Sequence, residues 1–131
     1  MAHQAERIAY ANEYGPKWRA AHPEANKAIA KRHRLKVRLE VIAAYGGVCS
    51  CCGEANPGFL SIDHINGGGA AHRKSLSMTT AGYPMYSWLK THGWPEGFRV
   101  LCYNCNLGRA FHGDGTCPHL MSPASLSLAV T

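Results

Sequence analysis

The 131-residue sequence lacks any long hydrophobic run, and no stretch approaches the ~18 apolar residues that a membrane-spanning helix needs. Its first residues are polar, with Glu6 and Glu13 among them, and do not form the apolar core of a signal peptide. We therefore expect a cytoplasmic protein that has no contact with membranes. In such a compartment, the six cysteines are expected to be reduced thiols rather than disulfides.

Acidic residues are also scarce. Eight aspartates and glutamates stand against 14 lysines and arginines, which gives a net charge of +6 and a pI near 9.2. This balance favours a polyanionic partner such as nucleic acid. The 14 glycines and seven prolines indicate many turns and a modest core, which a bound metal would help to stabilise.

The first 45 residues contain no cysteine and are predicted to form a helical extension that binds DNA. A first helix over Gln4–Glu13 is expected to end at Gly15 and Pro16, because glycine and proline together break helices. A second helix is predicted for Pro23–Tyr45, with the proline in its first turn.

This second helix carries six basic residues and no acidic residue between positions 27 and 38. Four of the basic residues recur at helical spacing on one face: Lys27, Lys31, Arg34 and Arg38. An adjacent apolar stripe is expected to pack on the rest of the protein and consists of Leu35, Leu39 and Ile42. A solvated surface helix is the alternative, but uncompensated positive charge favours contact with a phosphate backbone.

Residues 46–119 are predicted to form a second region with little regular structure. Its expected elements are strands at Phe59–Ile65 and Phe98–Leu101 and short helices at Pro84–His92 and Asn104–His112. Residues 66–82 are rich in glycine, serine and threonine and are predicted to be a loop. The uncharged tail, residues 120–131, is expected to be poorly ordered.

Two Cys-x-x-Cys pairs dominate the second region, Cys49 with Cys52 and Cys102 with Cys105. Two such turns can complete the tetrahedron of thiolates around a zinc ion. A redox pair or unrelated buried thiols are the alternatives, and two matched pairs favour zinc. Because protein atoms would fill all four positions, the predicted zinc site is structural.

Three further donors fall outside these pairs. Cys51 lies inside the first pair and could replace a neighbouring ligand. Cys117 and His119 permit a second partial site, but we favour a free thiol beside a surface histidine.

The candidate chemistry lies at Asp63 and His64, at the end of the first predicted strand. A carboxylate can bind a hard cation such as Mg²⁺, and a neutral imidazole can accept a proton near pH 7. Strand alternation directs the two side chains to opposite faces, so they converge only if the strand ends or bends there. Glycines 67–69 permit such a bend, and a purely structural loop is the alternative.

The order of these features resembles the HNH endonucleases, and in particular the zinc-containing branch that includes recombination endonuclease VII and related phage proteins. The resemblance covers about Tyr45–Arg109 and the ending Gly115–His119. It implies an α+β fold with a small ββα-metal core. In this core, two antiparallel strands precede a helix, and a zinc ion bound by four cysteines stabilises the core. In this chain, a helical extension would precede the core.

The resemblance also implies site residues and an activity. Asp63 and Asn106 would bind one catalytic Mg²⁺ or Mn²⁺, and His64 would be the general base. Many family members carry histidine where this chain has Asn106. The four paired cysteines would bind Zn²⁺. The implied activity is hydrolysis of phosphodiester bonds in duplex or branched DNA, in a bacterial or phage-infected cell, and cutting both strands would point to a homodimer.

Further basic residues near this motif are candidate contacts to DNA phosphates: His72, Arg73, Lys74 and Arg109. For His72, assistance in the reaction and orientation of the leaving group are open alternatives. For Arg73, Lys74 and Arg109, a solvated surface charge without any DNA contact is an equal alternative. The competing function is a non-catalytic, zinc-stabilised DNA-binding module. That function would explain the cysteines and the positive charge but not the presence of Asp63, His64 and Asn106. A zinc redox or metal-storage protein would not explain the basic helix.

Overall fold

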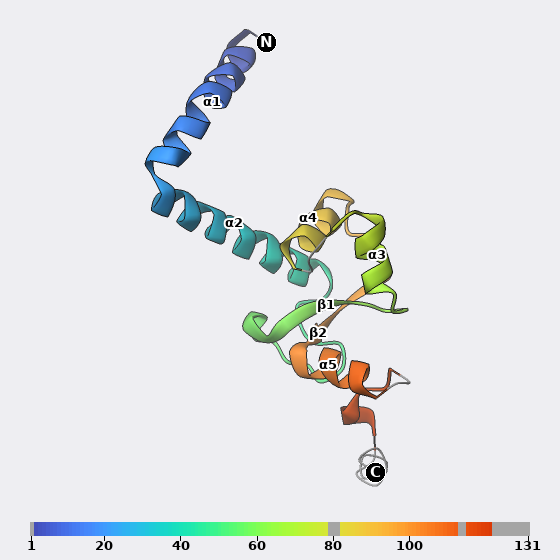
Figure 1. Ribbon diagram of the computed structural model, residues 1–131. Coiled ribbons are helices and arrows are strands. Elements are labelled where there is room, and N and C mark those ends of the chain that lie inside the picture. The colour runs from blue at the N-terminus through green and yellow to red at the C-terminus, as the bar shows by residue number, and fades with distance from the viewer. Residues whose placement is uncertain (1, 79–81, 113–114, 122–131) are drawn as a thin grey trace. The chain divides into compact units, whose positions relative to one another are not determined.

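The computed structural model describes residues 2–78, 82–112 and 115–121. The chain divides into two compact units, Met1–Lys36 and Val37–Thr131. Within the described residues, five α-helices and one two-stranded antiparallel sheet form an α+β structure (Figure 1). This result confirms the α+β class predicted above. None of the helices in the described part of the chain has the length and apolar character to cross a membrane.

The N-terminal helices are α1 (Ala2–Ala21) and α2 (Pro23–Ala44). The prediction that the first helix ends at Gly15 and Pro16 is wrong, because α1 continues through Pro16. A proline inside a helix costs one backbone hydrogen bond, since it has no N–H to donate to the preceding turn. Helical bonding resumes and reaches His22, whose N–H donates to the Trp18 carbonyl at 2.9 Å.

The C-terminal part of α2 buries a face that shares only Ile42 with the predicted apolar stripe, so the prediction is confirmed for Ile42 and wrong for Leu35 and Leu39. Val37, Val41 and Ile42 are buried, whereas Leu35 and Leu39 are about half exposed. Both sets have helical spacing, so the sequence pattern alone did not distinguish them. The contacts of the folded chain select the valine face.

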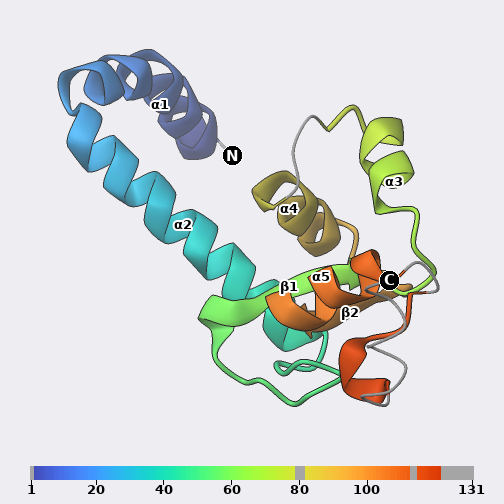
Figure 2. The same cartoon turned by 60° about the horizontal axis from the view of Figure 1, so that its bottom comes forward.

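The sheet is a hairpin of β1 (Leu60–His64) and β2 (Phe98–Cys102), and α5 (Tyr103–Phe111) follows β2 directly. Both predicted strands and the predicted helix Asn104–His112 are thereby confirmed. The strands pair antiparallel, with Asp63 opposite Arg99. Figures 1 and 2 show α5 running along the hairpin, and it packs against both strands.

Two small clusters form the core of the second unit. One lies where α2 meets α4 (Tyr83–Thr91), which confirms the helix predicted there; it consists of Val37, Val41, Met85 and Leu89. The other lies around the hairpin and α5 and consists of Ile42, Cys49, Leu60, Val100, Leu101, Cys102, Cys105 and Cys117. Half of this second cluster is cysteine, so its stability depends on what the thiols bind.

The predicted loop between the strands contains a helix, α3 (Gly69–Ser75). Gly67 and Gly68 have positive φ angles of 71° and 79° and turn the chain from β1 into this helix. Residues 79–81 of the predicted loop lie outside the described residues, as do residues 122–131 of the predicted tail. Two short 3₁₀ turns, η1 (Pro57–Phe59) and η2 (Pro118–Leu120), complete the described elements.

Candidate functional site

An open groove of about 490 Å³ lies at the end of the hairpin where β1 stops. Its lining residues come from β1 and the turn after it, β2, α5 and the segment that follows: Asp63, His64, Ile65, Asn66, Gly67, Arg99, Asn106, Arg109, Ala110 and Gly115. The structure thus brings the three predicted catalytic residues to one place. Arg109, a predicted phosphate contact, lies in the same groove.

Asp63 and His64 reach the groove from opposite faces of the hairpin. Ser61, two residues before Asp63, bonds to Asn106 on α5, which identifies the face that Asp63 shares. His64 bonds to His72 on α3, on the other side. His64 is the last residue of β1, at the end of the hairpin where the chain leaves towards β2, and both side chains line the groove there.

Asp63 is held by Arg99, a residue that sequence reasoning missed. The guanidinium Nε and Nη2 lie 2.9 and 2.8 Å from the same carboxylate oxygen, Oδ2. Because both bonds go to Oδ2, the other carboxylate oxygen of Asp63, Oδ1, can bind other partners. The sequence placed Arg99 in a strand but gave no register, and only the register sets it opposite Asp63.

Asn106 is oriented by a chain of hydrogen bonds into the core. Its Nδ2 donates to the Ser61 hydroxyl at 3.1 Å, and that hydroxyl donates to the Leu101 carbonyl at 3.0 Å. Ser61 is buried, so this chain also satisfies a polar group inside the protein. With the amide nitrogen engaged, the Asn106 carbonyl oxygen Oδ1 is the atom that can bind a cation.

His64 is held by a second histidine. Its Nε2 lies 2.9 Å from Nδ1 of His72, and its ring contacts the Phe98 ring at a centroid distance of 4.7 Å. A proton on Nε2, donated to His72, leaves Nδ1 of His64 as an acceptor. A Cβ at Gly69 would lie only 2.9 Å from this Nδ1, so glycine preserves the space beside it.

The surroundings of His64 favour its neutral form. Burial is the main cause that lowers the pKa of His64 below its ordinary value of 6.5. Positive charge on His72 and Arg73 lowers this pKa further, and the Asp63 carboxylate opposes them. At pH 7 the imidazole is therefore mostly uncharged and can accept a proton.

The other predicted DNA-contacting residues have different environments. Arg38 is turned inward, with its Nη2 2.8 Å from the Leu60 carbonyl and 3.1 Å from the Tyr103 hydroxyl, so it ties α2 to the hairpin and α5. Three further residues are exposed on α2 (Lys27, Lys31 and Arg34), and Lys74 is exposed on α3. Lys27 also forms an exposed ion pair with Glu24, which contributes little to stability.

The four predicted zinc ligands also come together. The ligand atoms of Cys49, Cys52, Cys102 and Cys105 all lie within 4.8 Å of one another. The Cys52 and Cys102 sulfurs are 3.7 Å apart, close to the separation of about 3.8 Å that a tetrahedral zinc imposes on two thiolates. Cys102 also caps α5, because its sulfur accepts a hydrogen bond from the Cys105 N–H. This group has the donors and spacing to hold a metal ion such as zinc.

A second group of donors shares a member with the first. Cys51, Cys105, Cys117 and His119 also place their ligand atoms within 4.8 Å of one another. His119 Nδ1 lies 3.2 Å from the Cys105 sulfur and 3.4 Å from the Cys117 sulfur. Cys117 is buried, so the predicted free thiol is instead one of four clustered donors. In the sequence, this group was indicated by Cys51, a third cysteine within the first Cys-x-x-Cys pair.

Ionisation of these thiols is uneven. Burial opposes the thiolate of Cys49, but hydrogen bonds from the backbone of Cys52, Cys102 and Cys51 lower its pKa to about 6. In contrast, burial and the surrounding thiols raise the pKa of Cys105. The surroundings therefore favour the thiolate at Cys49 and the protonated thiol at Cys105.

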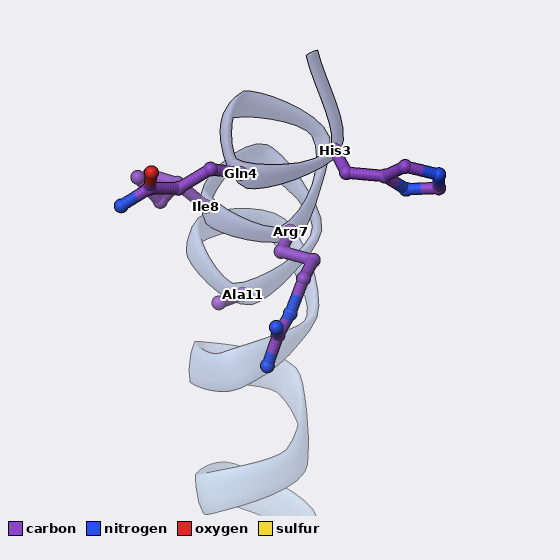
Figure 3. Close-up of a pocket in the computed structure, with 5 residues that line it drawn as sticks. All are labelled: His3, Gln4, Arg7, Ile8 and Ala11. Atoms are coloured by element: carbon purple, nitrogen blue, oxygen red, sulfur yellow. The ribbon is translucent and has the colours of Figure 1, made fainter. Parts of the chain in front are cut away.

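A hollow on α1 is not a comparable site. The residues that line it all come from this one helix: His3, Gln4, Arg7, Ile8 and Ala11 (Figure 3). The labelled His3 and Arg7 side chains point in different directions, so they do not converge on a common ligand.

In comparisons with known proteins, no family model, no curated protein and no solved structure matches the chain. The function is therefore inferred from the chemistry of the site and from the motif described above.

Proposed function

We propose that the protein is a metal-dependent DNA endonuclease of the HNH type, with a ββα-metal core formed by β1, β2 and α5. The observation that carries this proposal is the groove at the hairpin end. There a carboxylate, an amide oxygen and a neutral imidazole meet, supplied by Asp63, Asn106 and His64. Together they are the donors and the base that phosphodiester hydrolysis requires.

Asp63 and Asn106 fit a hard divalent cation. Each offers an oxygen, and each has its remaining polar atoms engaged by Arg99 or Ser61. Oxygen donors held in this way suit Mg²⁺ or Mn²⁺ rather than a soft metal. A bound Mg²⁺ would neutralise the negative charge that develops on the scissile phosphate.

His64 is assigned as the general base. His72 fixes its ring and leaves Nδ1 as the acceptor for a proton of the attacking water. Arg109, in the groove, and Arg73, close to His64, offer donors for the phosphate. We assign to His72, whose role the sequence left open, the positioning of His64.

The four paired cysteines are assigned to a structural zinc ion. This ion would hold the end of β2 and the start of α5 against the first cysteine loop, where few apolar side chains are available. DNA would be the partner of the basic helix, through the exposed residues Lys27, Lys31 and Arg34 and their basic neighbours.

Nicking of supercoiled plasmid DNA, with and without Mg²⁺, tests the proposal. We expect nicking by the zinc-loaded protein only when Mg²⁺ or Mn²⁺ is present. Asp63→Ala should bind DNA equally well and lose this metal-dependent cleavage. Binding without cleavage by the unaltered protein, with branched DNA also tried, would favour the non-catalytic DNA-binding module. Full cleavage by Asp63→Ala would move the metal site elsewhere.

Arg99→Ala should lower cleavage about 10- to 100-fold without unfolding the protein, because Asp63 loses the two hydrogen bonds that orient it. The Mg²⁺ concentration for half-maximal cleavage should rise, and high Mg²⁺ should restore part of the rate. Arg99→Lys is the matched control: it keeps the charge but not the paired donors, and an intermediate effect is expected. An unchanged Mg²⁺ dependence in Arg99→Ala would contradict this positioning role.

A further inference from the structure

We propose that the cysteine cluster binds two zinc ions that share the Cys105 thiolate. The first is the ion assigned above to the paired cysteines. The second is held by Cys51, Cys105, Cys117 and His119. This second ion goes beyond the proposed endonuclease function, and it depends on the first site only through the shared ligand.

The number of donors fits two ions. Two tetrahedral ions need eight coordination positions, four and four. The two groups have one side chain in common, which leaves seven donors, six cysteines and one histidine. A thiolate can bridge two metal ions, so Cys105 in both sites makes seven donors sufficient. Every cysteine of the chain then has a role.

The distances from His119 to the three sulfurs of the second group are close to those around a metal ion. Zinc–sulfur and zinc–nitrogen bonds of about 2.3 and 2.0 Å place a sulfur and a nitrogen about 3.5 Å apart around a tetrahedral ion. His119 Nδ1 lies 3.2, 3.4 and 4.0 Å from the sulfurs of Cys105, Cys117 and Cys51. The first two distances are slightly shorter than the expected separation, and the third is longer.

The first cysteine loop can serve both groups because it is tightly closed. The Cys49 N–H donates to the Glu54 carbonyl at 2.9 Å, and the Gly53 N–H donates to the Cys49 carbonyl at 3.0 Å. Within this loop the adjacent Cys51 and Cys52 belong to different groups. One short turn thus supplies ligands to both ions.

Packing on α5 brings the C-terminal donors to the same place. Gly108 lies three residues after Cys105, one turn along the helix. A Cβ at Gly108 would be 2.8 Å from Cδ of Pro118, so only glycine allows the segment with Cys117 and His119 to approach this closely. The donors of the second group are therefore positioned by the fold itself.

The second ion would fasten the C-terminal segment to the hairpin core. Gly115, two residues before Cys117, lines the groove that contains Asp63 and His64. The ion therefore also holds one wall of the proposed active site.

Metal counting on the full-length, reduced protein tests the proposal. Zinc loading followed by dialysis, native mass spectrometry and elemental analysis should give two zinc ions per chain. Cys117→Ser should retain one ion, whereas Ser50→Ala, in the same loop as Cys51 but without a donor role, should retain two. One ion in the unaltered protein would overturn the second site alone, and no bound zinc would overturn both sites. Plasmid cleavage, measured separately, decides the endonuclease function.

Substitution of the zinc by ¹¹³Cd tests the shared thiolate without any mutation. Its NMR spectrum should contain two cadmium resonances, each split by coupling to the other ion through the Cys105 sulfur. Two unsplit resonances would overturn the bridge. A disulfide between Cys51 and Cys117 that persists after treatment with a thiol reductant and zinc loading, located by mass spectrometry of the cross-linked peptides, would overturn the second site.

Discussion

His64→Ala should abolish most DNA cleavage, by about 10²- to 10⁴-fold, while DNA binding and thermal stability change little. The alanine removes the only group of the proposed site assigned to accept the proton of the attacking water. It leaves the metal-binding oxygens of Asp63 and Asn106 in place. Single-turnover cleavage of plasmid DNA at saturating Mg²⁺ measures the loss.

The pH dependence of the unaltered protein gives a second measure of the same role. Burial lowers the pKa of His64 below 6.5, so the base is neutral at pH 7. Cleavage should therefore be constant near neutral pH and fall as the pH drops through this lowered pKa. His64→Ala should lose this acidic limb of the profile.

His92→Ala is the matched control, because His92 is an exposed histidine at the end of α4 that does not line the groove. It should cleave DNA at the rate of the unaltered protein. Equal cleavage by His64→Ala and the control would show that His64 is not the base.

Cys102→Ser should unfold the hairpin and α5 and abolish cleavage as a consequence. Structural zinc contributes about 10–16 kcal/mol of apparent binding energy in zinc-finger peptides, and that is as large as the whole stability of most domains, about 5–15 kcal/mol. Here half of the core cluster around the hairpin is cysteine, so few apolar contacts remain once the ion is lost. Hydrogen exchange of the β1 and β2 amides measures this loss of structure separately from the N-terminal helices.

A chelator should reproduce the effect of Cys102→Ser on the unaltered protein, and added zinc should reverse it. Ser50→Ala, in the first cysteine loop, should keep its amide protection and its zinc. A Cys102→Ser protein that retains protected hairpin amides and cleaves DNA without zinc would contradict the structural role of the ion.

The sequence by itself determined the elements and chemical groups whose signals are local. The strand at Leu60–His64 follows from a run of β-favouring residues, and α5 follows from the position of the last cysteine pair. A Cys-x-x-Cys turn brings its own two thiols together, so this spacing alone identified the ligand pairs. The glycines after His64 also predicted the bend at the end of β1, although the sequence did not reveal that α3 follows Gly68.

Only the tertiary structure decided which distant groups meet. Asp63 and Arg99 are 36 residues apart, and their pairing depends on the register of the hairpin. Asn106 is 45 residues from Ser61, whose hydroxyl orients its amide. His119 reaches Cys51, 68 positions earlier in the chain. Such contacts arise from the packing of α5 on the hairpin and of the C-terminal segment on α5, and neither packing leaves a periodic or local mark in the sequence.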